Sequence, residues 1–266
     1  MQSTIVARTG GVDQQQSVVT TWVEGGVGVV TLNDPSHRNA LSHAMSDALA
    51  VGLRRVLEQG AHAVVLAATP PVFCAGGSID DLLDPPGPLS AAYAGVHALA
   101  DCPVPTVAAV GGAAIGAGVS LPLVCDVVVV SDAALFDPRF LDIAIHPGGG
   151  HLWYLARRVG YQGAAAMVLC GDVLSGAEAV AAGLAWRCVR DEQLLDAALG
   201  LARRAAGRSP ALVARTKETL RGTVNLSDPT EAERIELAAQ EWSVTQPEHL
   251  AAVKRLGAQL RGPRPR

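Results

Sequence analysis

The chain has 266 residues, of which 49% are hydrophobic and 17% are charged, and its formal net charge at pH 7 is -4. This composition predicts a soluble globular protein with a large core, without the basic surface that would attract nucleic acid or an anionic membrane. The largely apolar stretch 106–123 is interrupted by glycines and by Pro122, so it is a poor candidate for a membrane span. The cysteines show no CxxC spacing, which favours unpaired thiols in a reducing compartment and predicts a cytoplasmic protein.

Residues 1–16 are polar and lack the apolar core of a signal peptide, so we expect a disordered leader there. The next part should contain, in chain order, strands at 17–24 and 28–32 around a Gly25-Gly26 turn, a helix at 39–57, a strand at 63–67, a helix at 90–100, a strand at 106–110, a helix at 119–124 and a strand at 126–130. After Gly160 the pattern predicts helices at 161–170, 175–182, 191–207, 209–222 and 228–257. The expected organisation is an α/β layered core over 17–205 and a helical C-terminal region over 206–266.

Two glycine-rich loops, 70–77 and 111–118, each follow a predicted strand and precede helical sequence. Glycine lets a backbone approach a ligand closely, and the first amides of a helix have no internal acceptor. Two such loops could direct two N–H groups at one oxygen atom, as stabilisation of a thioester enolate requires. The alternative is that both are tight turns in which glycine serves packing. Neither loop matches the phosphate-binding patterns GxxxxGKS/T or GxGxxG.

Between residues 17 and 257 the chain resembles the crotonase (enoyl-CoA hydratase/isomerase) superfamily. The segments that carry the resemblance, in the family's order and spacing, are LNDPSHRNAL (32–41), VFCAGGSI (72–79), GGAAIGAGVSLPLVCDVVVVSDAALF (111–136), HPGGG (146–150), GAEAVAAGLAWRCV (176–189) and SPALVARTKETL (209–220). The resemblance implies a spiral of ββα units and a C-terminal helical region that packs protomers into trimers, often paired as hexamers. It also implies an acyl-CoA substrate. Because coenzyme A is then part of the substrate, no separate cofactor and no metal are expected.

The resemblance further implies an oxyanion hole made by the backbone amides of Gly77 and Ala117. Contacts with coenzyme A are implied for His37, Arg38, Ala40, Ala75, Ser78, Ile79 and Asp80. For His37 and Arg38 the alternative is a solvated turn, and Asp80 could instead be an acid at the start of a helix.

The sequence departs from the family's pattern at two positions. A hydratase of the family carries a carboxylate at each of them, and these carboxylates activate water and return a proton. Their positions hold Ser120 and Phe140. Asp142 is one candidate replacement, and His146 is another because histidine is a natural base near neutral pH. The alternatives are a structural or surface role for Asp142 and an ordinary loop role for His146. His151 follows the glycine run and is expected mainly to cap the next helix.

The leading hypothesis is an acyl-CoA enzyme of the hydratase or isomerase type, in which one base such as Asp142 or His146 moves a proton. The alternative is a non-catalytic acyl-CoA-binding protein that kept the pocket and lost the carboxylates. A nicotinamide dehydrogenase is disfavoured, because the first helix opens with Arg38-Asn39-Ala40 instead of a GxGxxG motif.

Overall fold

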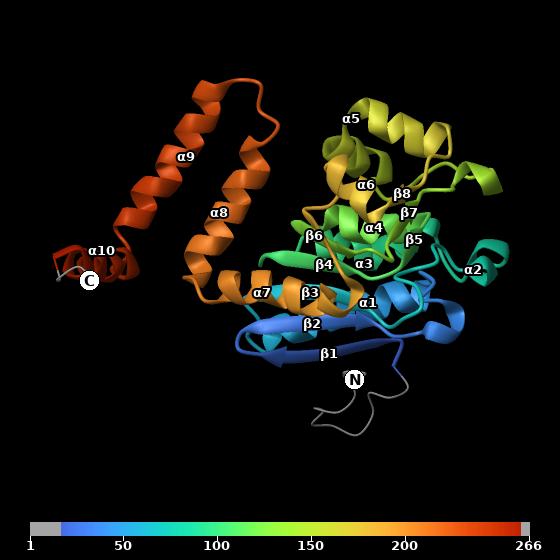
Figure 1. Ribbon diagram of the computed structural model, residues 1–266, viewed down its shortest axis with the longest axis horizontal. Coiled ribbons are helices and arrows are strands. Elements are labelled where there is room, and N and C mark those ends of the chain that lie inside the picture. Colours follow the sequence, from blue (N-terminus) through green and yellow to red (C-terminus); the bar gives the residue numbers. More distant parts are fainter. Residues whose placement is uncertain (1–16, 262–266) are drawn as a thin grey trace. The chain divides into compact units, whose positions relative to one another are not determined.

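The computed structural model describes residues 17–261, so the predicted leader at 1–16 lies outside the described residues. The chain divides after Ala206 into two compact units, the first built of strands and helices and the second of helices (Figure 1). Within the described range, no helix is long and apolar enough to cross a membrane.

Strands and helices alternate along the first unit. Its strands are β1 (Val19–Glu24), β2 (Val27–Leu32), β3 (Ala63–Ala68), β4 (Thr106–Val110), β5 (Ala113–Ile115), β6 (Val127–Ser131), β7 (Leu135–Asp137), β8 (Leu174–Ser175) and β9 (Arg187–Val189). Its helices are α1 (His43–Glu58), α2 (Ile79–Leu83), α3 (Ala94–Ala100), α4 (Ala117–Val124), α5 (His151–Leu169), α6 (Gly176–Ala181) and α7 (Leu194–Ala206).

The strands of the first unit form two sheets. Six of the described strands form the larger sheet in the order β1-β2-β3-β4-β6-β9, and β5, β7 and β8 form the smaller one. β1 and β2 pair antiparallel around the predicted Gly25-Gly26 turn, and every later neighbour in the larger sheet pairs in parallel. The carboxyl ends of β3 and β4 therefore lie at one edge, and both glycine loops begin there.

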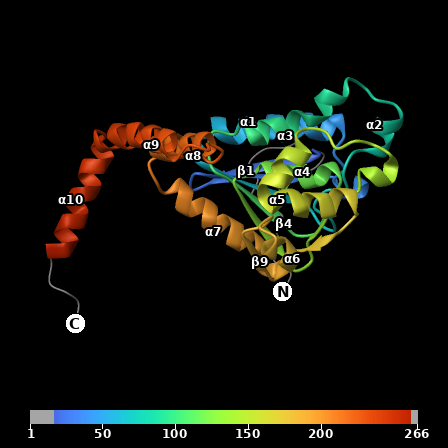
Figure 2. The same ribbon diagram turned by 90° about the horizontal axis from the view of Figure 1, so that it is seen from above.

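The central strands are buried on both faces, which explains why their sequences are continuous apolar runs. On one face, Val30 and Leu66 belong to the core that also contains buried residues of α1. On the other face, the alternate residues Val29 and Val65 pack with Ala198 of α7. Figure 2 shows α7 along one side of the strands and α1 with α3 along the other.

Helix α1 begins at His43, later than the predicted start at residue 39. The Ser42 side chain caps the helix by accepting a hydrogen bond from the Met45 amide at 3.1 Å. Arg38 and Asn39 have φ values of 54° and 52°, which place them in the left-handed region and outside any right-handed helix. The predicted helix was therefore too long, and its first residues form a loop instead.

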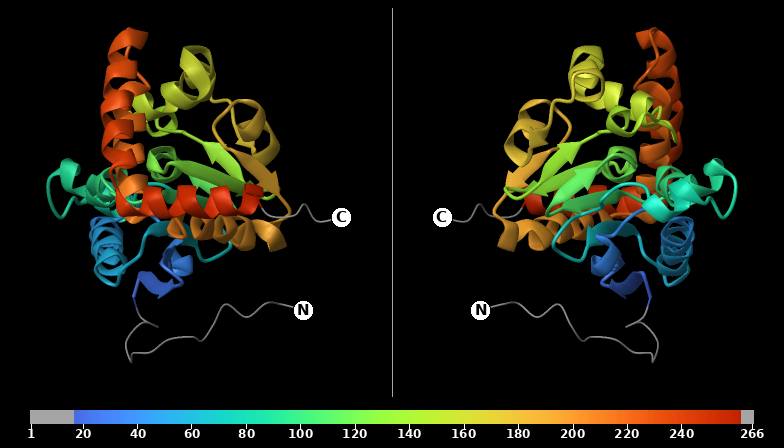
Figure 3. Two further views of the ribbon diagram at one scale, coloured as in Figure 1. Left: turned by 90° about the vertical axis from the view of Figure 1, so that its left-hand side faces the viewer. Right: turned by 90° about the vertical axis from the view of Figure 1, so that its right-hand side faces the viewer.

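Four short strands and the start of α5 differ from the sequence expectation. β5, β7, β8 and β9 contain only two or three residues each, too few for a hydrophobic period to identify them. Helix α5 begins at His151 and not at residue 161, with a kink at Gly160 where φ is 71° and ψ is 173°. Helix α5, which is yellow in Figure 3, packs against α4.

The second unit contains the described helices α8 (Pro210–Thr223), α9 (Pro229–Val244) and α10 (Pro247–Arg261). The single helix predicted over 228–257 is in fact two, separated at Thr245 and Gln246. Pro247 is the first residue of α10, a position where the missing N–H of proline leaves no hydrogen bond unmade.

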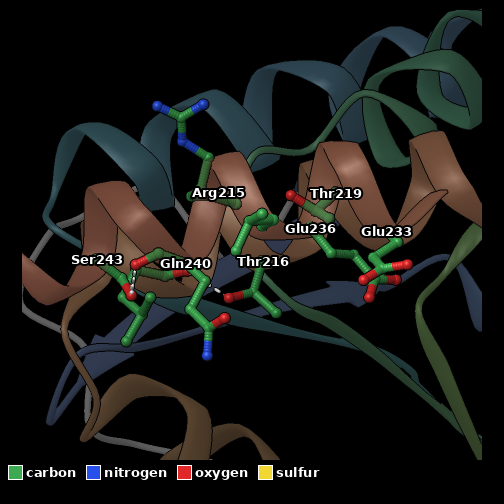
Figure 4. A pocket seen from close by; sticks show the side chains of 10 residues that line it. Arg215, Thr216, Thr219, Glu233, Glu236, Gln240 and Ser243 are labelled. Carbon is green, nitrogen blue, oxygen red and sulfur yellow. Dashed lines mark hydrogen bonds between the residues drawn. The ribbon is translucent and has the colours of Figure 1, made fainter. Parts of the chain in front are cut away.

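A hollow of about 430 Å³ lies between α8 and α9 in the second unit (Figure 4). The polar side chains around it belong to Arg215, Thr216, Thr219, Glu233, Glu236, Gln240 and Ser243. None of the site residues predicted from the sequence lines this hollow, so it is not the candidate active site.

Candidate active site

Hydrogen bonds hold the two glycine loops of the first unit side by side. The amides of Phe73 and Cys74 both donate to the carbonyl oxygen of Ala113, each at 3.1 Å. The amide of Ile115 donates in return to the carbonyl oxygen of Cys74 at 2.9 Å. The loops therefore meet as two short parallel segments, and their relative position is set by backbone groups.

Two glycines allow this close approach. Gly76 has a φ of 93°, and a Cβ placed on it would lie 2.8 Å from the carbonyl oxygen of Ile115. A Cβ on Gly118 would lie 2.5 Å from the carbonyl oxygen of Cys74. Both distances are shorter than van der Waals contact, so at these positions the glycines do serve packing, as the alternative interpretation held.

The amides of Gly77 and Ala117 are unpaired on these adjacent loops. Ala117 is the first residue of α4, and it follows Gly116, whose backbone has a φ of 49° and a ψ of -120°. Gly77 lies opposite Leu41 in a short parallel bridge. The hydrogen bonds of this bridge involve the residues on either side of Gly77, because the Leu41 amide donates to the carbonyl oxygen of Gly76 and the Leu41 carbonyl oxygen accepts from the amide of Ser78. Across residues 17–261, neither the Gly77 nor the Ala117 amide has a hydrogen-bond acceptor.

A buried asparagine fixes the loop that precedes α1. The Asn39 side-chain amide donates to the carbonyl oxygens of Thr69 at 2.8 Å and Val72 at 2.9 Å. Its oxygen accepts from the Asp34 amide at 2.8 Å. The left-handed φ of this residue is one that asparagine tolerates better than most side chains do. The sequence placed Asn39 at the start of a predicted helix and not in this buried role, and its place inside the motif LNDPSHRNAL was the available signal.

The residues expected to contact coenzyme A lie on or beside this loop and the first glycine loop. The carbonyl oxygen of Arg38 accepts from the Ala75 amide at 3.0 Å, which joins the two segments. The exposed members of the set are His37, Arg38, Ile79 and Asp80, and the half-buried members are Ala40, Ala75 and Ser78. Hydrogen bonds thus bring the segment 37–40 and the first glycine loop together.

Helix α2 is tied to the start of α1. Ser78 caps α2, and Asp81 in its first turn accepts hydrogen bonds from His43, from the backbone amide at 2.7 Å and from Nδ1 at 2.8 Å. These bonds lower the pKa of Asp81, and the Asp81 carboxylate in turn raises the pKa of His43. Asp80 lies beside Asp81 in the first turn, where acidic residues favour a helix start.

Ser120 and Phe140, which hold the expected carboxylate positions, meet at a third residue. His151 Nδ1 lies 3.0 Å from Ser120 Oγ. The ring of Phe140 packs edge-on against the His151 ring, with 4.8 Å between their centroids. All three side chains are buried. From the sequence, His151 was expected mainly to cap a helix. Its place directly after a glycine run and at the start of a helix was the signal for a place in the site.

The buried groups of the site are uncharged. Burial lowers the pKa of His151 to about 4, so its ring is neutral at physiological pH. Burial also raises the pKa of the Cys74 thiol to about 11. A thiol in that state is not a nucleophile, which agrees with a packing role for Cys74 beside Gly118.

Asp142 and His146 lie on the surface of the first unit. Asp142 is exposed in a single 3-10 turn (Leu141–Ile143). His146 is exposed as well, with Nδ1 2.8 Å from the carbonyl oxygen of Pro147. In the described part of the chain neither forms a hydrogen bond with Ser120 or His151, and their role as acid or base stays a prediction. The described residues contain no group of three or more His, Cys, Asp or Glu that could hold a metal ion.

The chain is similar to known proteins in both sequence and structure. A sequence model of the enoyl-CoA hydratase/isomerase family matches residues 23–253. A probable enoyl-CoA hydratase of Mycobacterium tuberculosis H37Rv, EchA14, is 39% identical over 248 residues, which cover 89% of this chain and 96% of that protein. The 1,2-epoxyphenylacetyl-CoA isomerase of Escherichia coli K12 is 34% identical over 198 residues, covering 71% of this chain and 76% of that protein. The crystal structure of an enoyl-CoA hydratase from Mycobacterium smegmatis matches with a TM-score of 0.84 and 26% identity, covering 91% and 96% of the two chains.

Proposed function

This chain belongs to the enoyl-CoA hydratase/isomerase family of enzymes, and we propose that it binds an acyl-CoA thioester and stabilises its enolate. The thioester oxygen accepts hydrogen bonds from the amides of Gly77 and Ala117. The observation that carries the proposal is that these two amides are unpaired on adjoining loops. Coenzyme A enters as part of the substrate, and no other cofactor is proposed.

The proposed role of the two amides follows from the atom on which negative charge develops during the reaction. When a base removes a proton from the carbon next to the thioester carbonyl, the electron pair moves onto the carbonyl oxygen. Two fixed amides that face this oxygen stabilise the negative charge without reorganising, because the backbone bonds of the glycine loops already hold them in place.

The CoA part of the substrate is assigned to the exposed residues beside the site. A guanidinium is well suited to phosphate oxygens, so Arg38 is the proposed phosphate contact, with His37 next to it. Ala75, on the first glycine loop, and Ser78, which caps α2 directly after it, face the pantetheine arm, and Ile79 and Asp80 follow at the start of α2. Ala40 completes the segment that begins at His37.

The oxyanion hole can be tested at a single residue, because Ala117 is the first residue of α4 and proline is tolerated at that position. Ala117→Pro removes the unpaired N–H and should lower kcat/KM by about 100- to 1,000-fold, the usual effect of losing one oxyanion donor. Ala117→Gly keeps the amide and is the matched control. Undiminished activity in Ala117→Pro would show that this amide does not contact the oxygen.

A one-base reaction, such as moving a double bond, fits the site better than hydration. The positions at which the resemblance implies carboxylates hold a serine and a phenylalanine, and neither can activate water as a carboxylate does. The relatives described as a hydratase and as an isomerase define the range of reactions to which the proposal applies.

A second candidate function is acyl-CoA binding without catalysis, which the replacement of both carboxylates favours. Purified protein incubated in D2O with saturated, α,β-unsaturated and β,γ-unsaturated acyl-CoA thioesters, followed by mass spectrometry, separates the two. Deuterium uptake or product formation supports the enzyme. Tight binding of these thioesters with neither result supports the binding protein.

The trimer or hexamer and the cytoplasmic location belong to the same proposal. Exposed apolar residues on α10 support self-association; they are Leu250, Val253, Leu256 and Leu260. Light scattering after gel filtration should give three or six times the mass of one chain. No disulfide links any of the cysteines in the part of the chain that the structure describes, and Cys74, Cys102 and Cys125 are buried, which supports a reducing compartment.

A further inference from the structure

His151 carries a buried nitrogen atom that nothing in the described chain satisfies. Its side chain is 1% exposed, and its Nδ1 is paired with Ser120 Oγ at 3.0 Å. Its Nε2 has no hydrogen-bond partner among residues 17–261. It is the only such side-chain atom among the buried residues that the structure describes. Most buried polar side-chain atoms in proteins have a hydrogen-bond partner, so an unpaired one calls for an explanation.

The histidine lies close to the proposed oxyanion amides. Ser120 is one helical turn after Ala117 in α4, and residues three apart on a helix are neighbours on its surface. The Cα–Cβ bond of Ser120 leans toward the helix start, where the Ala117 amide is. The His151 ring is therefore separated from that amide by one helical turn and one hydrogen bond.

The hydrogen bond to Ser120 indicates which nitrogen carries the proton. A buried N–H group without an acceptor is rarer in proteins than an acceptor without a donor. The unpaired Nε2 is therefore the unprotonated nitrogen, and Nδ1–H donates to Ser120 Oγ. Phe140 lies against the ring and provides no charge, and burial keeps the ring neutral. Nε2 thus has a lone pair available for a proton.

We propose that His151 is the base of this site, that Ser120 is its positioning residue, and that the substrate is a β,γ-unsaturated acyl-CoA. The proposal deepens the function proposed above and rests on it. A β,γ-double bond makes the α-proton more acidic than that of a saturated acyl group, and a neutral, buried imidazole is a weak base that needs such a proton. A single base also suits a site whose other expected acid position holds Phe140.

The reaction balances with this one base. The α C–H bond breaks, the proton moves to His151 Nε2, and the electron pair forms a dienolate whose negative charge lies on the thioester oxygen between the two amides. The imidazolium then gives the proton to the γ-carbon. A new C–H bond forms there, the double bond moves from the β,γ to the α,β position, and the ring is neutral again.

The test compares wild type with His151→Asn, because the asparagine side chain can still bond to Ser120 but has no atom at the Nε2 position. The probe is trans-3-hexenoyl-CoA in D2O, with conversion to the conjugated thioester followed by ultraviolet absorbance and deuterium by mass spectrometry. We expect kcat to fall by about 100- to 10,000-fold, the range for loss of a general base. Binding of the probe, measured by calorimetry, should change by less than about threefold. His62→Asn, at the opposite end of β3, is the matched control and should behave as wild type.

Two more variants separate catalysis from folding. His151→Gln places an amide near the Nε2 position, and its circular dichroism together with probe binding shows whether the site is folded; it should bind the probe and remain inactive. Ser120→Ala removes the partner of Nδ1 and should lower kcat by about 10- to 100-fold while KM stays the same, as expected when a supporting hydrogen bond is lost. If Ser120→Ala changes kcat and KM equally, or changes neither, Ser120 does not position His151.

The outcomes distinguish the two proposals. Activity that persists in a folded His151→Asn overturns the assignment of the base and leaves the acyl-CoA function standing. Wild type that binds trans-3-hexenoyl-CoA without converting it overturns the His151 proposal and favours the non-catalytic binder. Wild type that binds no acyl-CoA overturns the proposed function and this inference with it.

Discussion

Burial of His151 should make the protein lose stability in mild acid. Burial lowers the pKa of this residue to about 4, from an ordinary value of 6.5 that an unfolded chain should show. Between these values the unfolded chain binds a proton that the folded chain does not. The contribution of neutral His151 to the free energy of unfolding is therefore fully present above about pH 7, and it is lost as the pH falls from 6.5 toward 4. Proton linkage gives a loss of about 2 kcal/mol by pH 5 and about 3 kcal/mol at full effect.

Urea unfolding followed by circular dichroism at about pH 7.5 and pH 5 measures this loss, at one fixed protein concentration because self-association adds to stability. Wild type should lose about 2 kcal/mol more than His151→Asn, which cannot be protonated at this position. His62→Asn should follow wild type. Equal losses in wild type and His151→Asn would refute the reasoning, since they would mean that the folded state accepts the proton as readily as the unfolded state.

Three further substitutions test the frame around the site. Gly118→Ala forces a Cβ against the Cys74 carbonyl, and should destabilise the protein by about 1–3 kcal/mol in thermal or urea unfolding and lower kcat/KM. Asn39→Gly keeps the left-handed backbone but removes three hydrogen bonds of the buried amide, so the free energy of unfolding should fall by about 2–4 kcal/mol and KM for acyl-CoA should rise. Arg158→Met removes a half-buried guanidinium that donates to the carbonyl oxygens of Leu123 in α4 and of Cys125 just after it, and should lower the free energy of unfolding by about 2–3 kcal/mol.

A matched variant controls each of these substitutions. Gly222→Ala adds a Cβ in open space within α8 and should stabilise by about 0.5–1 kcal/mol. Arg38→Gly, next to Asn39 and also at positive φ, should not destabilise the fold. Arg157→Met affects an exposed side chain that stacks on Trp153, and should change stability by less than about 1 kcal/mol. If a control loses as much stability as its partner, the contact assigned to the partner is not the cause.

Sequence was sufficient for the features that depend on local pattern. The alternation of the longer strands and helices, the Gly25-Gly26 hairpin and the superfamily resemblance came from periodicity, turn residues and motifs. The family match and the similarity to solved structures confirm the superfamily and fold class. Long elements were placed well because each carries several turns of repeated apolar spacing. Errors fell where a local pattern is too short or is overridden, as at the strands of two or three residues and at Asn39.

Only the tertiary structure could decide which distant residues meet. Gly77 and Ala117 are 40 positions apart, and the loops that carry them lie side by side because bonds between Cys74, Ala113 and Ile115 join these loops. Likewise, Ser120 and His151 lie on different helices, and no spacing along the chain predicts their hydrogen bond. Periodicity records which face of an element is buried, but not what that face is buried against. The chain pattern therefore indicated the fold class and the two loops, whereas packing of α5 against α4 brings His151 to Ser120, the contact on which the proposed base rests.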